Sequence, residues 1–182
     1  MAPDPTAVPA ERRYGAVDVH YPPAGGASAA LVVSGDVRFA AIVDERVAWL
    51  SEVAEYRPGR FFARELPALR AVLPGPHALD LLIVDGYVDL DPLGRPGLGA
   101  HVHAEFALPV VGVAKSAFRT ATHAVAVRRG SAARPLYVTA AGLPVERAAA
   151  LVAAMAGRHR LPDALRRVDQ LARADGSPSS AF

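Results

Sequence analysis

The sequence predicts a mixed α/β fold in which helices flank one central sheet. Three observations lead to this prediction. Short segments rich in β-branched and apolar residues follow one another between residues 14 and 43. Two continuous apolar runs, at 79–84 and 109–114, are typical of strands that are buried on both faces. Segments with helical spacing of apolar residues separate these runs and follow them.

The N-terminal strands are expected to form an antiparallel meander. Residues 14–20 alternate as a strand does, and residues 29–34 and 37–43 are two further apolar runs. Gly35-Asp36 joins these two runs. A Gly-Asp pair between apolar runs is typical of a tight hairpin turn.

The rest of the chain alternates helices with strands. Residues 61–72 have helical spacing, and Pro67 inside them is expected to kink the helix or shift its start. The run at 79–84 predicts a buried strand. Further along the chain, helices are expected over 98–106, 144–156 and 162–174, and strands over 109–114, 121–128 and 136–139.

Composition predicts a globular protein with one sizeable core. The 182 residues are 52% hydrophobic, which suits a single domain. We place that domain at 13–174, between flexible tails of polar, Pro-, Ser- and Gly-rich composition at 1–12 and 175–182. The absence of cysteine excludes disulfides, thiolate metal sites and cysteine nucleophiles.

Charge and hydropathy set limits on the partners. The net charge of +2 allows nucleic-acid binding without requiring it. The N-terminal segment has no apolar signal core, and no window has the length and apolarity of a membrane helix. We therefore expect a soluble, cytoplasmic protein that is a monomer and has no membrane partner.

Four widely spaced carboxylates are the candidates for chemistry. Asp18 lies in an apolar strand, Asp85 ends another strand, and Glu65 and Asp169 lie on arginine-rich helices. Taken singly, each has an ordinary alternative: a water-facing strand residue, an Asp-Gly turn, or a solvated helix face. If the four converge, however, their oxygens suit a hard cation such as Mg²⁺, which many phosphodiesterases use.

Two further features bear on this hypothesis. Lys115, the only lysine, follows an apolar strand, where its ammonium would contact a phosphate oxygen or simply be solvated. The loop Tyr56-Arg-Pro-Gly59 precedes the Glu65 helix. Such a loop either wedges between bases or packs Tyr56 onto the core.

The order of these motifs resembles endonuclease V over residues 14–172. The most specific parts are the Tyr-x-Pro-Gly segment, followed at the family's spacing by Arg-Glu, and the Gly-Val-Ala-Lys block. The series runs Gly15-Ala-Val-Asp18, Tyr56-Arg-Pro-Gly59, Phe62-Ala-Arg-Glu65, Val84-Asp85-Gly86, Gly97-Leu-Gly-Ala-His101, Gly112-Val-Ala-Lys115, Pro135-Leu-Tyr-Val138, Arg160-Leu-Pro-Asp163 and then Asp169.

The resemblance implies a ribonuclease H-like fold and an Mg²⁺-dependent endonuclease, with Mn²⁺ as a substitute. Members of this family nick DNA, RNA or both at the second phosphodiester 3′ to deaminated adenine, which is the hypoxanthine base of inosine. A cation at such a site lowers the pKa of a bound water and stabilises the leaving oxygen.

The resemblance also implies roles for individual residues. The four carboxylates match the family's metal-binding set, Lys115 matches its active-site lysine, and Tyr56 matches the aromatic side chain of a strand-separating wedge. The flipped base is expected to be recognised by backbone groups, because the glycine-rich loops that form its pocket carry few polar side chains. The residues implied in substrate binding are Tyr56, Pro58, Gly59, Gly86 and Asp91.

The chain departs from the family pattern after Asp85. Asp91 stands in place of a histidine, Val88 replaces a glycine, and the loop is longer by one residue. A carboxylate at position 91 is expected to recruit a metal or to shift metal affinity. A second family histidine, after the strand at 136–139, is missing. Two alternatives therefore remain: a lesion- or structure-binding module that has lost turnover, and a nuclease for other substrates such as branched or mismatched DNA.

Overall fold

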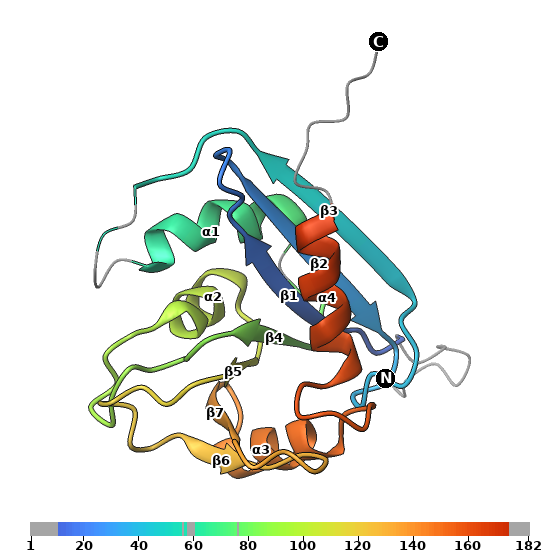
Figure 1. Cartoon of the computed structure of the whole chain (residues 1–182), viewed down its shortest axis with the longest axis vertical. Coiled ribbons are helices and arrows are strands. Elements are labelled where there is room, and N and C mark those ends of the chain that lie inside the picture. Colours follow the sequence, from blue (N-terminus) through green and yellow to red (C-terminus); the bar gives the residue numbers. More distant parts are fainter. Residues whose placement is uncertain (1–10, 56, 58–60, 76, 175–182) are drawn as a thin grey trace, which may run out of the picture.

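Seven strands form one mixed sheet in the order β3-β2-β1-β4-β5-β7-β6 (Figure 1). The structure is a computed structural model that describes residues 11–55, 57, 61–75 and 77–174. The strands are β1 (Tyr14–His20), β2 (Ala27–Ser34), β3 (Asp44–Leu50), β4 (Leu81–Asp85), β5 (Val110–Ala114), β6 (Val125–Val127) and β7 (Leu136–Ala141). The helices are α1 (Phe61–Val72), α2 (Leu98–Phe106), α3 (Val145–Ala154) and α4 (Asp163–Ala174).

The sheet combines an antiparallel part with a parallel centre. β2 pairs antiparallel with β1 and with β3, which makes the expected meander. β4 lies parallel to β1 on one side and to β5 on the other. β7 and β6 then extend the sheet in the antiparallel sense. The predicted mixed α/β fold is confirmed.

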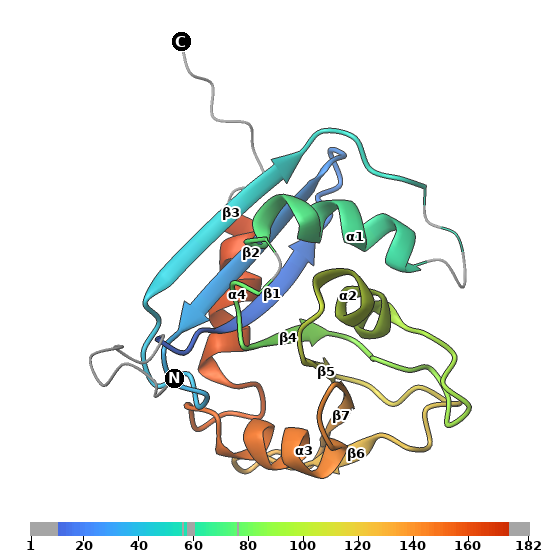
Figure 2. The same ribbon diagram turned by 180° about the vertical axis from the view of Figure 1, so that it is seen from behind.

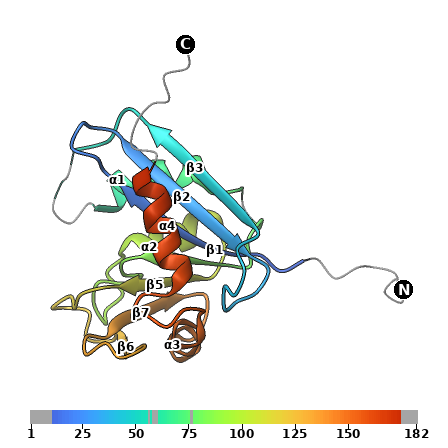
Figure 3. The ribbon, with the colours of Figure 1, turned by 45° about the vertical axis from the view of Figure 1, so that its right-hand side comes forward.

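Helices cover both faces of the sheet (Figures 2 and 3): α3 and α4 pack on one core, and α1 and α2 pack on the other. Successive side chains of a strand point to opposite faces. In β4, Leu81 and Ile83 therefore join the core under α3 and α4, and Leu82 and Val84 join the core under α1 and α2. Burial on both faces explains why this strand is a continuous apolar run.

The third strand of the meander lies later in the chain than we predicted. Residues 37–43 form a turn, and the strand begins at Asp44. The Asp36 carboxylate accepts hydrogen bonds from the backbone N–H groups of Arg38 (3.1 Å) and Ala40 (3.0 Å), and Phe39 has a φ of 55°. An aspartate that bonds the backbone ahead of it stabilises a turn over an extended strand.

The other elements follow the predictions with small shifts. The helices over 61–72 and 98–106 have the expected bounds, and Pro67 lies inside α1 without ending it. The strand expected over 121–128 is reduced to β6. No helix in the described part of the chain is both long and apolar enough to cross a membrane.

A buried arginine fixes the connection between α3 and α4. Arg129, which follows β6, is 6% exposed. Its guanidinium donates to the backbone carbonyl oxygens of Ala153, Met155, Gly157, His159 and Arg160. Five donors in a planar fork suit such a set of acceptors, which an ammonium group cannot reach together.

Replacing Arg129 should destabilise the fold strongly. Arg129→Met leaves several carbonyl groups without a partner, so we expect a loss of about 3 kcal/mol in the free energy of unfolding, measured by urea titration. Arg128→Met is the matched control, because Arg128 is exposed, and it should change the free energy by less than about 0.5 kcal/mol. Equal losses in the two variants would contradict the role assigned to Arg129.

Candidate active site

Three charged side chains meet at one edge of the sheet. Asp18 lies near the end of β1, Asp85 ends β4, and Lys115 directly follows β5. Val17 pairs with Val84 in the parallel register, so Asp18 and Asp85 follow at the same level. By strand alternation, all three side chains lie on the face that α4 covers.

Asp169 approaches the same edge from α4. This helix packs over β1 and β2 (Figure 3), and the carboxyl group of Asp169 lies close enough to that of Asp18 for each to affect the pKa of the other. A crevice of about 10 Å³ lies beneath the helix, enough for roughly one water-sized occupant. Its lining includes Asp18, Asp85 and Lys115, together with Val17, Val113, Leu161, Leu165 and Val168.

Lys115 supplies the positive charge of this cluster. Its Nζ lies 2.7 Å from Asp85 Oδ2 and donates a hydrogen bond to it. Burial acts to lower the pKa of Lys115, but the Asp85 hydrogen bond and the negative charges of Asp85, Asp18 and Asp169 raise it above the usual value. Lys115 is therefore a cation near neutral pH.

The pKa of Asp18 is strongly raised in this cluster. Burial, followed by repulsion from Asp85, raises its pKa to about 7, and the hydrogen bond to Asp169 adds to this increase. For Asp169, burial acts to raise the pKa, but hydrogen bonds from Arg173 and Asp18 and the charge of Lys115 bring it below the usual value. Asp18 is therefore the weaker acid of the two carboxyl groups.

Glu65 approaches from the opposite face of the sheet. It lies on α1, among residues that pack on the other core, and is 5% exposed. Burial raises its pKa to about 7; a hydrogen bond from Tyr21 lowers the value, and repulsion from Asp18 and Asp85 raises it. Glu65 therefore lies within electrostatic reach of Asp18 and Asp85, although it lies on the opposite face of the sheet from α4.

The donor set fits a hard divalent cation in chemistry, although no cage is preformed. In residues 11–55, 57, 61–75 and 77–174, no group of three or more Asp, Glu or His side chains is already arranged to hold a metal ion. Carboxylate oxygens are the preferred ligands of Mg²⁺ and Mn²⁺. Burial first, and then repulsion between neighbouring acids, raises the pKa of Asp18 and of Glu65, and a cation bound beside them would favour their charged forms.

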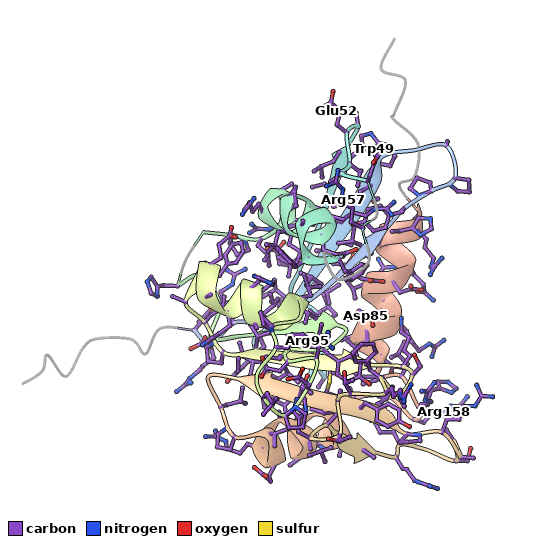
Figure 4. The ribbon with its side chains drawn as sticks, turned by 90° about the vertical axis from the view of Figure 1, so that its left-hand side faces the viewer. Trp49, Glu52, Arg57, Asp85, Arg95 and Arg158 are labelled. Carbon is purple, nitrogen blue, oxygen red and sulfur yellow. The ribbon has the colours of Figure 1, made fainter. Side chains whose placement is uncertain are left out.

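A larger pocket lies next to the cluster, and Gly86, the residue after Asp85, is part of its lining. It measures about 380 Å³, which lies within the size range of small-ligand pockets. Its lining is mostly aromatic and apolar, with one charged group: Phe61, Phe62, Gly86, Tyr87, Leu90, Arg95, Pro96, Gly97, Leu98 and Phe118. Figure 4 shows Asp85 and Arg95 on the same face of the molecule.

Contacts between distant loops build the wall of this pocket. The Tyr87 hydroxyl donates to the Ser116 carbonyl oxygen (2.8 Å) and accepts from the Phe118 N–H (3.0 Å). At Gly112, an added Cβ would lie 2.6 Å from the Gly86 carbonyl oxygen, so β5 passes too close beneath this loop for any side chain. Tyr87, Arg95 and Phe118 were not among the predicted site residues, because loop-to-loop contacts leave no periodic signal in the sequence.

Asp91 makes its contacts within its own loop, and its expected effect on metal binding stays a prediction. Its carboxylate accepts hydrogen bonds from the N–H groups of Leu93 (3.0 Å) and Arg95 (3.1 Å), and it pairs with the Arg95 guanidinium at 3.2 Å. These bonds brace its own loop and give no support to the expected recruitment of a metal. The expected wedge residues Tyr56, Pro58 and Gly59 lie outside the described residues.

Comparisons with known proteins point to one family. A family model described as endonuclease V matches residues 4–130. A curated endonuclease V of Azotobacter vinelandii is 33% identical over 179 residues, which cover 86% of this chain and 80% of that protein. Another, from Streptomyces coelicolor, is 31% identical over 193 residues, with 94% and 82% coverage.

Solved structures agree on the fold. The Streptomyces avermitilis endonuclease V structure superposes with a TM-score of 0.68 at 28% identity, covering 88% of this chain and 79% of that one. Ciona intestinalis endonuclease V, solved with DNA containing an inosine followed by a ribo-adenosine, gives 0.71 at 18% identity, with 89% and 84% coverage. The predicted ribonuclease H-like fold is confirmed.

The charge on Asp18 should cost stability when no cation is bound. Because burial raises the pKa of Asp18 in the folded protein from its ordinary value of 3.8 to about 7, stability falls as the pH rises through this interval. At pH 8, Asp18→Asn in the metal-free protein should raise the midpoint of thermal unfolding by about 5 °C or more. The gain should shrink towards pH 4, and a gain independent of pH would contradict this origin.

Proposed function

The chain belongs to the endonuclease V family, and from this membership we propose that it nicks nucleic acid 3′ to a deaminated adenine in a divalent-cation-dependent reaction. It is a nuclease, a hydrolase of phosphodiester bonds. The observation that carries the proposal is the cluster of Asp18, Asp85, Lys115 and Asp169 beside a pocket of about 380 Å³. In this proposal the chain acts as a monomer in the cytoplasm.

The pocket supports a flipped purine as the recognised group. Its aromatic walls suit the faces of a base, and its floor begins at Gly86, directly after Asp85. A base held there brings its own backbone to the carboxylate edge. The inosine-containing DNA bound by the Ciona relative supports the same substrate class for this chain.

The acidic residues would hold the cation. We assign this role to Asp18, Asp85 and Asp169, with Glu65 reaching the site from α1. Mg²⁺, with Mn²⁺ as a substitute, would supply an acidified water and charge stabilisation of the leaving oxygen. Asp85 would have to share its carboxylate between the cation and Lys115, which its two oxygens allow.

Lys115 would neutralise charge on the scissile phosphate. Its ammonium has three N–H donors, and one of them is bonded to Asp85. The other two donors are available for phosphate oxygens while the ion pair keeps the side chain in place. Strand separation would fall to Tyr56, Pro58 and Gly59, the wedge segment that the family resemblance implies.

A nicking assay tests this function. We expect the protein with Mg²⁺ to cut a strand that contains a single inosine, in duplex or single-stranded form, with DNA and RNA assayed in parallel. Asp85→Ala should lower the rate by at least about a thousandfold. Glu146→Ala, an exposed carboxylate on α3, is the control and should cut normally.

The outcome separates the alternatives. Binding of inosine strands without cleavage in Mg²⁺ or Mn²⁺ would favour the binding module, which the Asp91 substitution and the missing histidine motivate. Cleavage of branched or mismatched DNA, with inosine strands left intact, would favour the altered nuclease.

Cation binding should also be visible without cleavage. Adding Mg²⁺ or Mn²⁺ at pH 8 should raise the midpoint of thermal unfolding, because the cation binds the folded cluster and offsets its repulsion. The rise should be lost in Asp85→Asn and kept in Glu146→Gln. An equal rise in both variants would mean that the cation binds elsewhere.

A further inference from the structure

Exposed apolar side chains gather around the pocket. The large apolar side chains exposed in the described residues are Val43, Phe61, Leu93 and Phe118. Phe61 and Phe118 line the pocket, and Leu93 belongs to the segment that contributes Leu90, Arg95 and Pro96 to it. Leu93 is 96% exposed, so its side chain projects into solvent beside the pocket.

The segment that carries Leu93 is a braced hairpin. Asp89 and Pro96 form a bridge, and the N–H of Leu90 donates to the Arg95 carbonyl oxygen at 2.7 Å. At the tip, the Asp91 carboxylate accepts from the N–H of Leu93 itself. These bonds fix the backbone of the hairpin and keep Leu93 at its tip.

The hairpin is also anchored to the neighbouring loop. The Thr120 hydroxyl donates to the Leu90 carbonyl oxygen (2.5 Å), and the Arg95 guanidinium donates to the same hydroxyl (3.2 Å). Figures 1 and 2 both show the lime segment after β4 and the gold segment before β6 reaching the same edge of the molecule. This anchor fixes the hairpin beside Phe118.

We propose that Leu93 is an apolar wedge that contacts stacked bases of a duplex substrate beside the pocket. The inference rests on the proposed function, and it adds a second contact to the wedge expected at Tyr56. A rigidly supported apolar side chain is what proteins insert between base steps. Arg95, at the foot of the hairpin and half exposed, pairs with Asp91 and so helps to hold the hairpin in this conformation.

Leu93→Ser should affect duplex substrates selectively. On an inosine duplex we expect KM to rise by about tenfold with kcat unchanged, because the apolar contact to the base stack is lost. On an inosine single strand, which has no duplex to open, KM should stay within about twofold. Leu93→Phe keeps an apolar tip and should retain most of the duplex affinity.

Val43→Ser is the matched control. Val43 is 65% exposed but lies next to the start of β3, at the opposite edge of the sheet from Asp85. It should leave both KM values unchanged. The same loss on duplex and single strand, or no loss on duplex, would overturn the wedge. A change in oligomeric state by light scattering with an unchanged duplex KM would assign Leu93 to contact with a second copy and also overturn it.

A binding measurement separates this inference from the proposed function. In Asp85→Ala, 2-aminopurine beside the inosine should brighten when the duplex binds, and Leu93→Ser added to that variant should lower the brightening at saturating protein by at least about twofold, because one of the two expected contacts with the base stack is lost. An unsubstituted chain that binds the duplex without nicking it would overturn the nuclease proposal, while the 2-aminopurine signal would still decide the wedge. A chain that binds no inosine duplex overturns both.

Discussion

The parallel pairing of β4 with β1 and β5 is the constraint on which the site depends. Parallel strands run in one direction, so their carboxyl ends share one edge of the sheet. The two-residue period then turns Asp18, Asp85 and Lys115 to the same face. No loop has to be shaped to bring these side chains together, because hydrogen bonds between buried backbones fix their spacing.

This arrangement concentrates negative charge in a partly buried site. Asp18 is half-buried and Glu65 is buried, both are repelled by neighbouring acids, and the charge of Lys115 lowers the pKa of Asp18 without cancelling the increase. Charge clusters of this kind persist where function requires them, because replacing them by neutral groups would favour folding. Burial of the apolar cores on both faces of the sheet stabilises the fold and offsets the destabilising effect of the charge cluster.

The sequence predicted the strand-end residues well and the loops poorly. Asp85 and Lys115 follow continuous apolar runs, and such runs identify buried strands without knowledge of their neighbours. The turn at 37–43 was missed because the Asp36 side chain competes with strand pairing for the same backbone groups. Tyr87, Arg95 and Phe118 acquire their roles from contacts with segments about 25–30 residues away, which composition and spacing do not record.

The hydrogen bonds of Arg129 determine which substitutions the connection between α3 and α4 can tolerate. Part of its conformation depends on a residue outside it, because the Arg129 side chain donates to carbonyl groups from Ala153 to Arg160. The exposed side chains of Arg158 and His159 take no part in these bonds, so changes there leave the support from Arg129 in place. A peptide that contains only α3, α4 and the connection between them would lack the Arg129 hydrogen bonds that hold this connection.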